Sequence, residues 1–231
     1  MGTVVTAVGN EGFRIVTPTA RIFVDAFYNV VPGVAEEPAL RARQVSEADL
    51  ILVTHSHWDH FNARSVSEAA TRAGAKVVGP QSVIQAVQDS LKPEALVEME
   101  PPLAKGRGLA ASVTATLPTA TVTAFRTFHS KDHNSYLVET PGFRFFHDGD
   151  NEETQRVDAA ALGRLDALFI GPWRGSGWVE FIEKLAPPRW FLMHLTGDEL
   201  DQHEAGRFLP DLCDRVPDGL VVLRPGQSFT L

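Results

Sequence analysis

The chain has 231 residues, of which 44% are hydrophobic and 22% are charged, with a formal net charge of -8 at pH 7. This length and composition are typical of a globular protein, and we expect a single domain over residues 1–231. The acidic balance disfavours a sequence-independent nucleic-acid binder, which needs an excess of basic charge.

The first half of the chain alternates strand-like and helix-like patterns. The continuous apolar run at residues 48–53 predicts a strand buried on both faces, and Gly74 ends an alanine-rich helical pattern. Such a βαβ rhythm places functional groups at the carboxyl ends of the strands. We expect strands at 13–19, 21–27, 48–55 and 75–80, and helices at 63–74 and 81–92.

The second half continues the pattern after residues 94–113, where we expect only short strands and turns. Pro141 and Gly142 mark a hairpin turn between two strand-like runs. The alternation of both element types predicts an α/β protein. We expect strands at 121–129, 135–140, 143–150, 166–172 and 189–195, helices at 177–188 and 198–209, and a closing strand pair over 219–231.

Residues 53–62, VTHSHWDHFN, crowd histidines and an aspartate at the end of a predicted strand. His55 and His57 are two positions apart in an extended segment, so both can point to one side. Asp59 and His60 follow after the strand ends. Packed polar groups cost desolvation energy unless something satisfies them, and a divalent metal ion would satisfy all four. Imidazole and carboxylate without thiolate suit zinc, iron, manganese or nickel.

Further ligand-type residues end other predicted strands: His129, Asp148, Asp150 and His194. Side chains at such strand ends can converge on one site. A two-metal site needs a bridging carboxylate, for which Asp150 is the natural candidate. An isolated histidine at a strand end is usually an ordinary hydrogen-bonded residue, and His203, on a predicted helix, is expected to be a surface residue.

The segment THSHWDH (54–60) resembles the signature of the metallo-β-lactamase fold superfamily. The likeness continues in order through RIFVDAFYNVVPG, NSYLVETPGFRFFHDGD, PRWFLMH and LRPGQSFTL, and so covers nearly the whole chain. Ala26 stands where the family usually has proline, and the GHTPG type of third-ligand segment is missing. Within the superfamily, the HDGD hairpin looks most like the branch that contains ascorbate-6-phosphate lactonase.

The resemblance implies a four-layer αβ/βα sandwich with a binuclear metal site in a cleft at the sheet edges. It implies two divalent metal ions, zinc first, with manganese, iron and nickel as alternatives. His133 competes with His129 as third ligand of the first ion, and we favour His129 because it directly follows its strand. The implied ligands are His55, His57 and His129 for one ion, Asp59, His60 and His194 for the other, and Asp150 as the bridge.

The implied chemistry is hydrolysis by a metal-bound hydroxide. Asp59 would ligate the second ion and help to orient the hydroxide. His133 and His147 are candidates to protonate the leaving group, although strand alternation allows His147 either to face the cleft or to pair with a neighbour. Trp58 is expected to pack beside the metal.

The loop over residues 171–178 follows a predicted strand, as active-site loops do. Trp173 would form an apolar wall there, and Arg174 would bind a carboxylate or phosphate. The alternative, a surface loop with a packed tryptophan, fits the sequence equally well.

The function expected from these features is a hydrolase acting on a small-molecule lactone, ester, amide or phosphodiester. The alternatives are a nuclease or RNA-processing phosphodiesterase on the same fold, and an iron-dependent redox enzyme. The start of the chain lacks a secretory signal, no apolar run approaches the length of a membrane span, and Cys213 is the single cysteine. We therefore expect a cytoplasmic protein without nucleic-acid or membrane partners, and its oligomeric state stays open.

Overall fold

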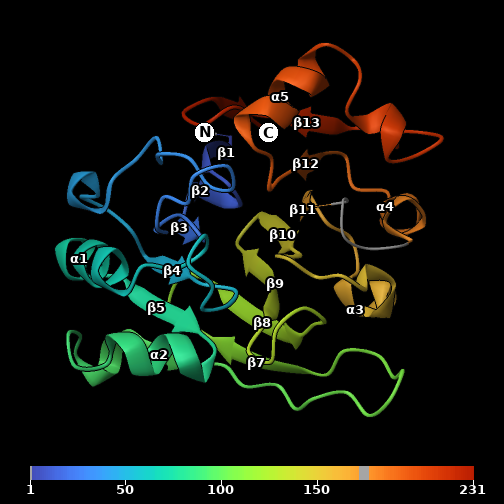
Figure 1. Ribbon diagram of the computed structural model, residues 1–231. Helices are drawn as coiled ribbons and strands as arrows, with labels where there is room; N and C mark the ends of the chain where they lie inside the picture. The colour runs from blue at the N-terminus through green and yellow to red at the C-terminus, as the bar shows by residue number, and fades with distance from the viewer. Residues whose placement is uncertain (1, 172–176) are drawn as a thin grey trace.

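Two seven-stranded sheets pack face to face, with helices on the outer face of each sheet (Figure 1). This description rests on a computed structural model covering residues 2–171 and 177–231. The layer order is helices, sheet, sheet, helices, which confirms the expected αβ/βα sandwich. In the described part of the chain, no helix has both the length and the apolar character needed to cross a membrane.

The first sheet combines an antiparallel part with a parallel part. Strands β14, β1, β2 and β3 pair antiparallel, and β3 to β6 pair parallel. In spatial order the strands are β14 (Ser228–Thr230), β1 (Val4–Gly9), β2 (Gly12–Val16), β3 (Arg21–Val24), β4 (Leu50–Leu52), β5 (Lys76–Gly79) and β6 (Leu96–Glu98).

The second sheet repeats this division. Strands β7 to β10 form an antiparallel meander, and β10 to β13 pair parallel, so the last strands end at the same edge. In spatial order the strands are β13 (Leu220–Val222), β12 (Trp190–Leu192), β11 (Ala167–Ile170), β10 (Phe143–His147), β9 (Asn134–Thr140), β8 (Thr121–Arg126) and β7 (Ser112–Thr116).

The helices cover the outer faces through apolar side chains. The helix α1 begins at the Asn62 cap, whose side chain accepts the Ser65 amide, and ends at Gly74 in the left-handed conformation. Helices α1 (Ala63–Ala73) and α2 (Gln81–Val87) cover the first sheet, and α3 (Ala159–Leu162), α4 (Trp178–Leu185) and α5 (Gly197–Glu204) the second. Short 3₁₀ turns lie at Ala42–Gln44, Pro93–Ala95, Thr154–Arg156 and Leu209–Asp211.

The main core lies between the sheets, where both inner faces contribute alternate residues of their strands. Ile22 and Leu50 of the first sheet and Phe145 and Phe169 of the second are almost completely buried there. The intervening residue Phe23 points instead to the outer core under α1. This two-sided burial fixes the strand register and with it the position of every residue at a strand end.

The predicted closing strand pair is wrong. β13 pairs parallel with β12 in the second sheet, whereas β14 pairs antiparallel with β1 in the first. The turn at Pro225 and Gly226 carries the chain from one sheet to the other, and the Gly226 amide donates to the Ala7 carbonyl. Each closing strand therefore extends an edge of a different sheet. β1 itself was not anticipated from the sequence.

Candidate metal centre

Two groups of metal-ligand atoms meet where β4, β8, β10 and β12 end. His55, His57, His129 and Asp150 form the first group, with one ligand atom of each within 4.8 Å of the others. His57 Nδ1 lies 3.2 Å from His129 Nε2, which lies 3.3 Å from Asp150 Oδ2. His57 is exposed, so this group is reachable from solvent.

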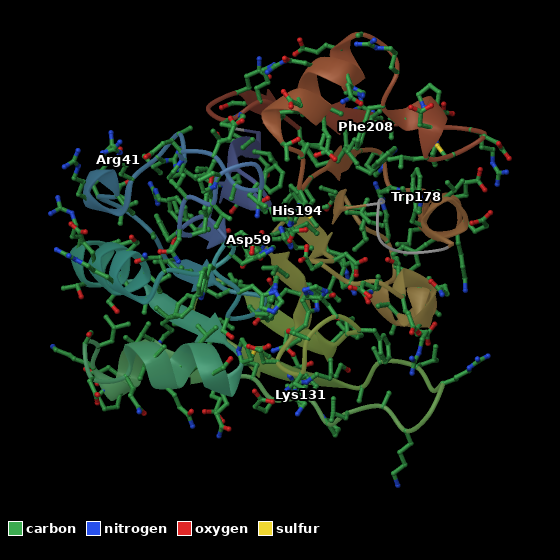
Figure 2. The ribbon with its side chains drawn as sticks, in the orientation of Figure 1. Arg41, Asp59, Lys131, Trp178, His194 and Phe208 are labelled. Atoms are coloured by element: carbon green, nitrogen blue, oxygen red, sulfur yellow. The ribbon has the colours of Figure 1, made fainter. Side chains whose placement is uncertain are left out.

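Asp59, His60 and His194 form the second group. His194 Nε2 lies 3.4 Å from Asp59 Oδ2, and Figure 2 shows the two residues beside each other at the centre of the molecule. Asp150 joins the groups, because its Oδ2 atom lies 3.5 Å from His60 Nε2 and its Oδ1 atom lies 3.4 Å from His194 Nε2. The structure thus brings together all seven residues proposed as ligands.

The spacing of these atoms fits metal coordination. Separations of 3.2–3.5 Å match the edge of a tetrahedral zinc site, about 3.3 Å for bonds of about 2.05 Å. Among the residues described, His55 Nε2, His60 Nε2 and Asp150 Oδ1 are buried without a hydrogen-bond partner. Buried polar atoms are rarely left unsatisfied, so the donor set fits a divalent metal.

Asp25 fixes the orientation of two of the imidazoles. The Thr54 hydroxyl donates to Asp25 Oδ2 and accepts from His55 Nδ1, at 2.5 and 2.9 Å. His60 Nδ1 donates to the same Asp25 oxygen at 3.2 Å. Both rings then turn an unprotonated Nε2 atom toward Asp150, which is the tautomer that a metal requires.

Burial and neighbouring charges shift the pKa values of the same two rings in opposite directions. Burial and the neighbouring His60 ring hold the pKa of His55 well below its usual value. Burial also lowers the pKa of His60, but the neighbouring carboxylates of Asp150 and Asp25 outweigh it and raise this pKa well above its usual value. The carboxylates around His60 therefore stabilise a positive charge next to this ring.

His129, not His133, faces the cluster. The Nδ1 atom of His129 donates to Glu152 Oε1 at 2.9 Å, which leaves Nε2 toward Asp150. His133 accepts the Asp150 amide at Nε2, so its Nδ1 proton goes to the Thr127 hydroxyl. Burial lowers the pKa of His133 to about 3, which keeps the ring neutral.

The two histidines considered as proton donors are engaged elsewhere. Both ring nitrogens of His133 have partners, and this ring supports the backbone of Asp150 rather than lining a binding surface. His147 is fully buried, stacks on Phe169 and donates from Nε2 to the Glu11 carbonyl at 3.1 Å. Of the two alternatives for His147, the structure favours pairing with a neighbour.

Asp132 ties the loops of the first group together. Its Oδ2 atom accepts the Ser56 amide and the hydroxyls of Ser56 and Ser82, and its Oδ1 atom accepts Ser130 Oγ. Although burial alone would raise it, these hydrogen bonds lower the pKa of Asp132. The carboxylate therefore anchors the backbone between His55 and His57 to the loop that carries His129.

The expectation that Trp58 packs beside the metal is wrong, because its side chain is 76% exposed. The surrounding backbone is nevertheless held, since the Trp58 carbonyl accepts the Asn29 amide at 2.8 Å and its side-chain amide at 3.2 Å. Trp58 thus presents its indole to solvent between two ligand residues. Trp173 and Arg174 lie outside the described residues.

Sequence reasoning missed Glu11 and Asp25, and did not consider Asp132. Asp25 follows an apolar strand, as the proposed ligands do, and this signal was available. Glu11 sits in the turn between β1 and β2, and its only sequence signal is a carboxylate between glycines in an apolar context. Asp132 lies in a polar loop, where one aspartate carries no special signal.

Comparisons with known proteins identify the family of this chain. Residues 20–197 match the family model described as the beta-lactamase superfamily domain. A UPF0173 metal-dependent hydrolase of Rubrobacter xylanophilus is 31% identical over 199 residues, covering 76% of this chain and 75% of that protein. A second protein of that name, from Nitratidesulfovibrio vulgaris, is 26% identical and covers 100% of this chain and 96% of its own length.

A solved structure shares the whole fold. Igni18, described as a novel metallo hydrolase from the archaeon Ignicoccus hospitalis, matches with a TM-score of 0.69 and 17% identity. The match covers 100% of this chain and 99% of that chain. At this identity the likeness supports the fold alone. The family assignment rests on the family model and the sequence relatives.

Proposed function

The chain belongs to the beta-lactamase superfamily and is a metal-dependent hydrolase, and from this premise we propose that it cleaves a small-molecule lactone, ester, amide or phosphodiester with two divalent ions. The observation that carries the proposal is Asp150, whose Oδ2 atom lies near both ligand groups and whose Oδ1 atom faces His194 of the second group. The net charge of -8 favours a small-molecule substrate over a nucleic acid.

The bound ions would supply a hydroxide nucleophile near neutral pH and polarise the electrophilic oxygen. The protein's own residues position the reacting groups and accept protons. Burial raises the pKa of Asp59, but the neighbouring imidazoles of His194 and His60 outweigh it and lower this pKa, so the carboxylate is ionised at neutral pH. The Asp59 side chain is 19% exposed and that of Asp150 4%, so Asp59 is the better placed to accept a proton from an attacking water.

We assign neither His133 nor His147 to protonation of the leaving group. Both rings are fully buried, and burial lowers the pKa of each, so both are neutral at pH 7. The proposed roles are therefore structural for His133, which holds the Asp150 amide, and for His147, which holds the turn at Glu11.

Elemental analysis of the purified protein, followed by a hydrolase panel, tests this proposal. We expect up to two transition-metal ions per chain, and turnover of a lactone, ester, amide or phosphodiester that a chelator abolishes and metal restores. Fewer than one tightly bound ion per chain after metal repletion would contradict it. A nuclease assay with manganese or zinc, and the visible absorbance of the purified protein, separate the nuclease and iron redox alternatives.

We propose, from the exposed Trp58, that the substrate carries an apolar group beside the bond to be cleaved. An exposed indole on a fixed backbone offers a large apolar contact at low entropic cost. We expect Trp58→Ala to raise KM about 10-fold, equivalent to about 1.4 kcal/mol, with kcat nearly unchanged. Steady-state kinetics measures this, and Trp58→Phe, which keeps an aromatic ring, should retain most of the affinity. Loss of bound metal in Trp58→Ala would instead assign the residue a structural role.

A further inference from the structure

Glu11 is a buried carboxylate that the proposed chemistry does not use. Its side chain lies in the turn between β1 and β2 and is completely buried. Within residues 2–171 and 177–231, neither of its carboxylate oxygens has a hydrogen-bond partner. An unpaired carboxylate in the interior is costly, so such a group is expected to meet a cation or a metal.

Glu11 lies beside two of the proposed ligand residues, Asp150 and His194. Its Oε2 atom also lies 3.5 Å from His60 Nδ1, the ring nitrogen that donates to Asp25. One ligand atom each of Glu11, Asp150 and His194 lie within 4.8 Å of one another. The carboxylate therefore lies within reach of an ion that Asp150 and His194 would hold.

The turn that carries Glu11 is bound to the segments that carry the proposed ligands. The Asn10 side-chain amide donates to the Asp59 carbonyl at 2.8 Å, and the His194 amide donates to the Asn10 carbonyl at 3.1 Å. Asn10 has a positive φ of 51°, a conformation that asparagine tolerates better than most residues. The position of Glu11 is thus set by the same backbone contacts that place Asp59 and His194.

Orientation of His60 does not explain Glu11. Asp25 already accepts from His60 Nδ1 at 3.2 Å, closer than the 3.5 Å of Glu11. Asp25 is in turn held by the amide and hydroxyl of Thr54. A carboxylate with fixed partners can orient a ring by itself, whereas Glu11 has no hydrogen-bond partner among the described residues and lies beside Asp150 and His194.

We propose that Glu11 is an additional carboxylate ligand of the ion held by Asp59, His60 and His194. This inference rests on the metal centre of the proposed function. With Asp150, that position then has three carboxylates and two imidazoles, whereas the first position has three imidazoles and one carboxylate. More oxygen donors and a higher coordination number suit manganese or ferrous iron, and the first position resembles a four-coordinate zinc site.

Metal titration of the apoprotein tests the assignment. We expect Glu11→Gln to weaken Mn²⁺ binding at one of two positions by at least about 10-fold, as loss of even an outer-shell partner costs roughly 10–100-fold. Zn²⁺ binding at the other position should stay within about 3-fold of wild type, because its ligands are unchanged. Calorimetry with Mn²⁺ and Zn²⁺, with the electron paramagnetic resonance signal of free Mn²⁺, measures both constants. Glu68→Gln, an acid-to-amide change on the exposed face of α1, is the matched control and should bind as wild type does.

Two results of the titration overturn the inference. If Glu11→Gln binds two Mn²⁺ ions with wild-type affinity, Glu11 is not a ligand, although the metal centre stands. If the wild type binds no metal, both this inference and the proposed function fail. Should Glu11→Gln not fold, Co²⁺-substituted wild type decides: weak visible bands of the second ion support a higher-coordinate site, and the intense bands of a tetrahedral ion contradict it.

Discussion

Asp150→Ala is expected to lower hydrolase activity by at least about 10³-fold and to release both metal ions, since loss of an outer-shell partner alone costs roughly 10–100-fold. The reason is the position of its carboxylate between the two ligand groups. Oδ2 lies 3.3 Å from His129 Nε2, and Oδ1 lies 3.4 Å from His194 Nε2. Removing it deletes a ligand from each group and the negative charge between them.

Asp148→Asn is the matched control for this prediction. Asp148 is two residues away and also buried, but its oxygens accept from Thr154, Asn151 and Ser135 rather than facing the cluster. Burial raises the pKa of Asp148 to about 6, so a neutral amide is a modest change. Elemental analysis and steady-state rates should show two ions and near wild-type activity in this variant. Equal losses in both variants would place the bridge elsewhere.

The convergence of the proposed ligands could be predicted from the sequence because they lie in the segments that follow apolar strands. Strand ends at one sheet edge lie close together, so His129, Asp150 and His194 could be assigned to the 55–60 cluster without knowing the sheet order. The order itself could not be predicted: β13 and β14 look like a hairpin, and which sheet edge each strand extends depends on tertiary packing.

The residues that support the centre depend on contacts that local sequence does not encode. Strand alternation alone does not determine whether His147 faces the cleft or the core. In the folded chain its ring contacts Phe13 and Phe169, which places it in the core. Glu11 can be recognised as part of the site only from the hydrogen bonds that join its turn to the backbones of Asp59 and His194. Burial without a partner, the property that singles out Glu11, exists only in the folded chain.

His57→Ala is expected to lose activity together with one ion, while the second ion stays bound. His57 Nδ1 lies 3.2 Å from His129 Nε2 and belongs to the first ligand group alone. Its removal leaves the carboxylate and imidazoles of the second group in place. We expect a loss of activity of about 10²–10³-fold, comparable to removal of one electrostatic contact to the transition state.

This selective loss distinguishes a ligand role from a structural one. His57 is exposed, so the free energy of unfolding of the apoprotein should change by no more than about 0.5 kcal/mol. His203→Ala is the control: His203 lies on α5, is partly exposed and belongs to neither ligand group. Elemental analysis and kinetics of both variants, with chemical denaturation of the apoproteins, measure the difference. If both variants lost activity equally, the centre would be misplaced, and if His57→Ala lost both ions, the two groups would act as a single cooperative site.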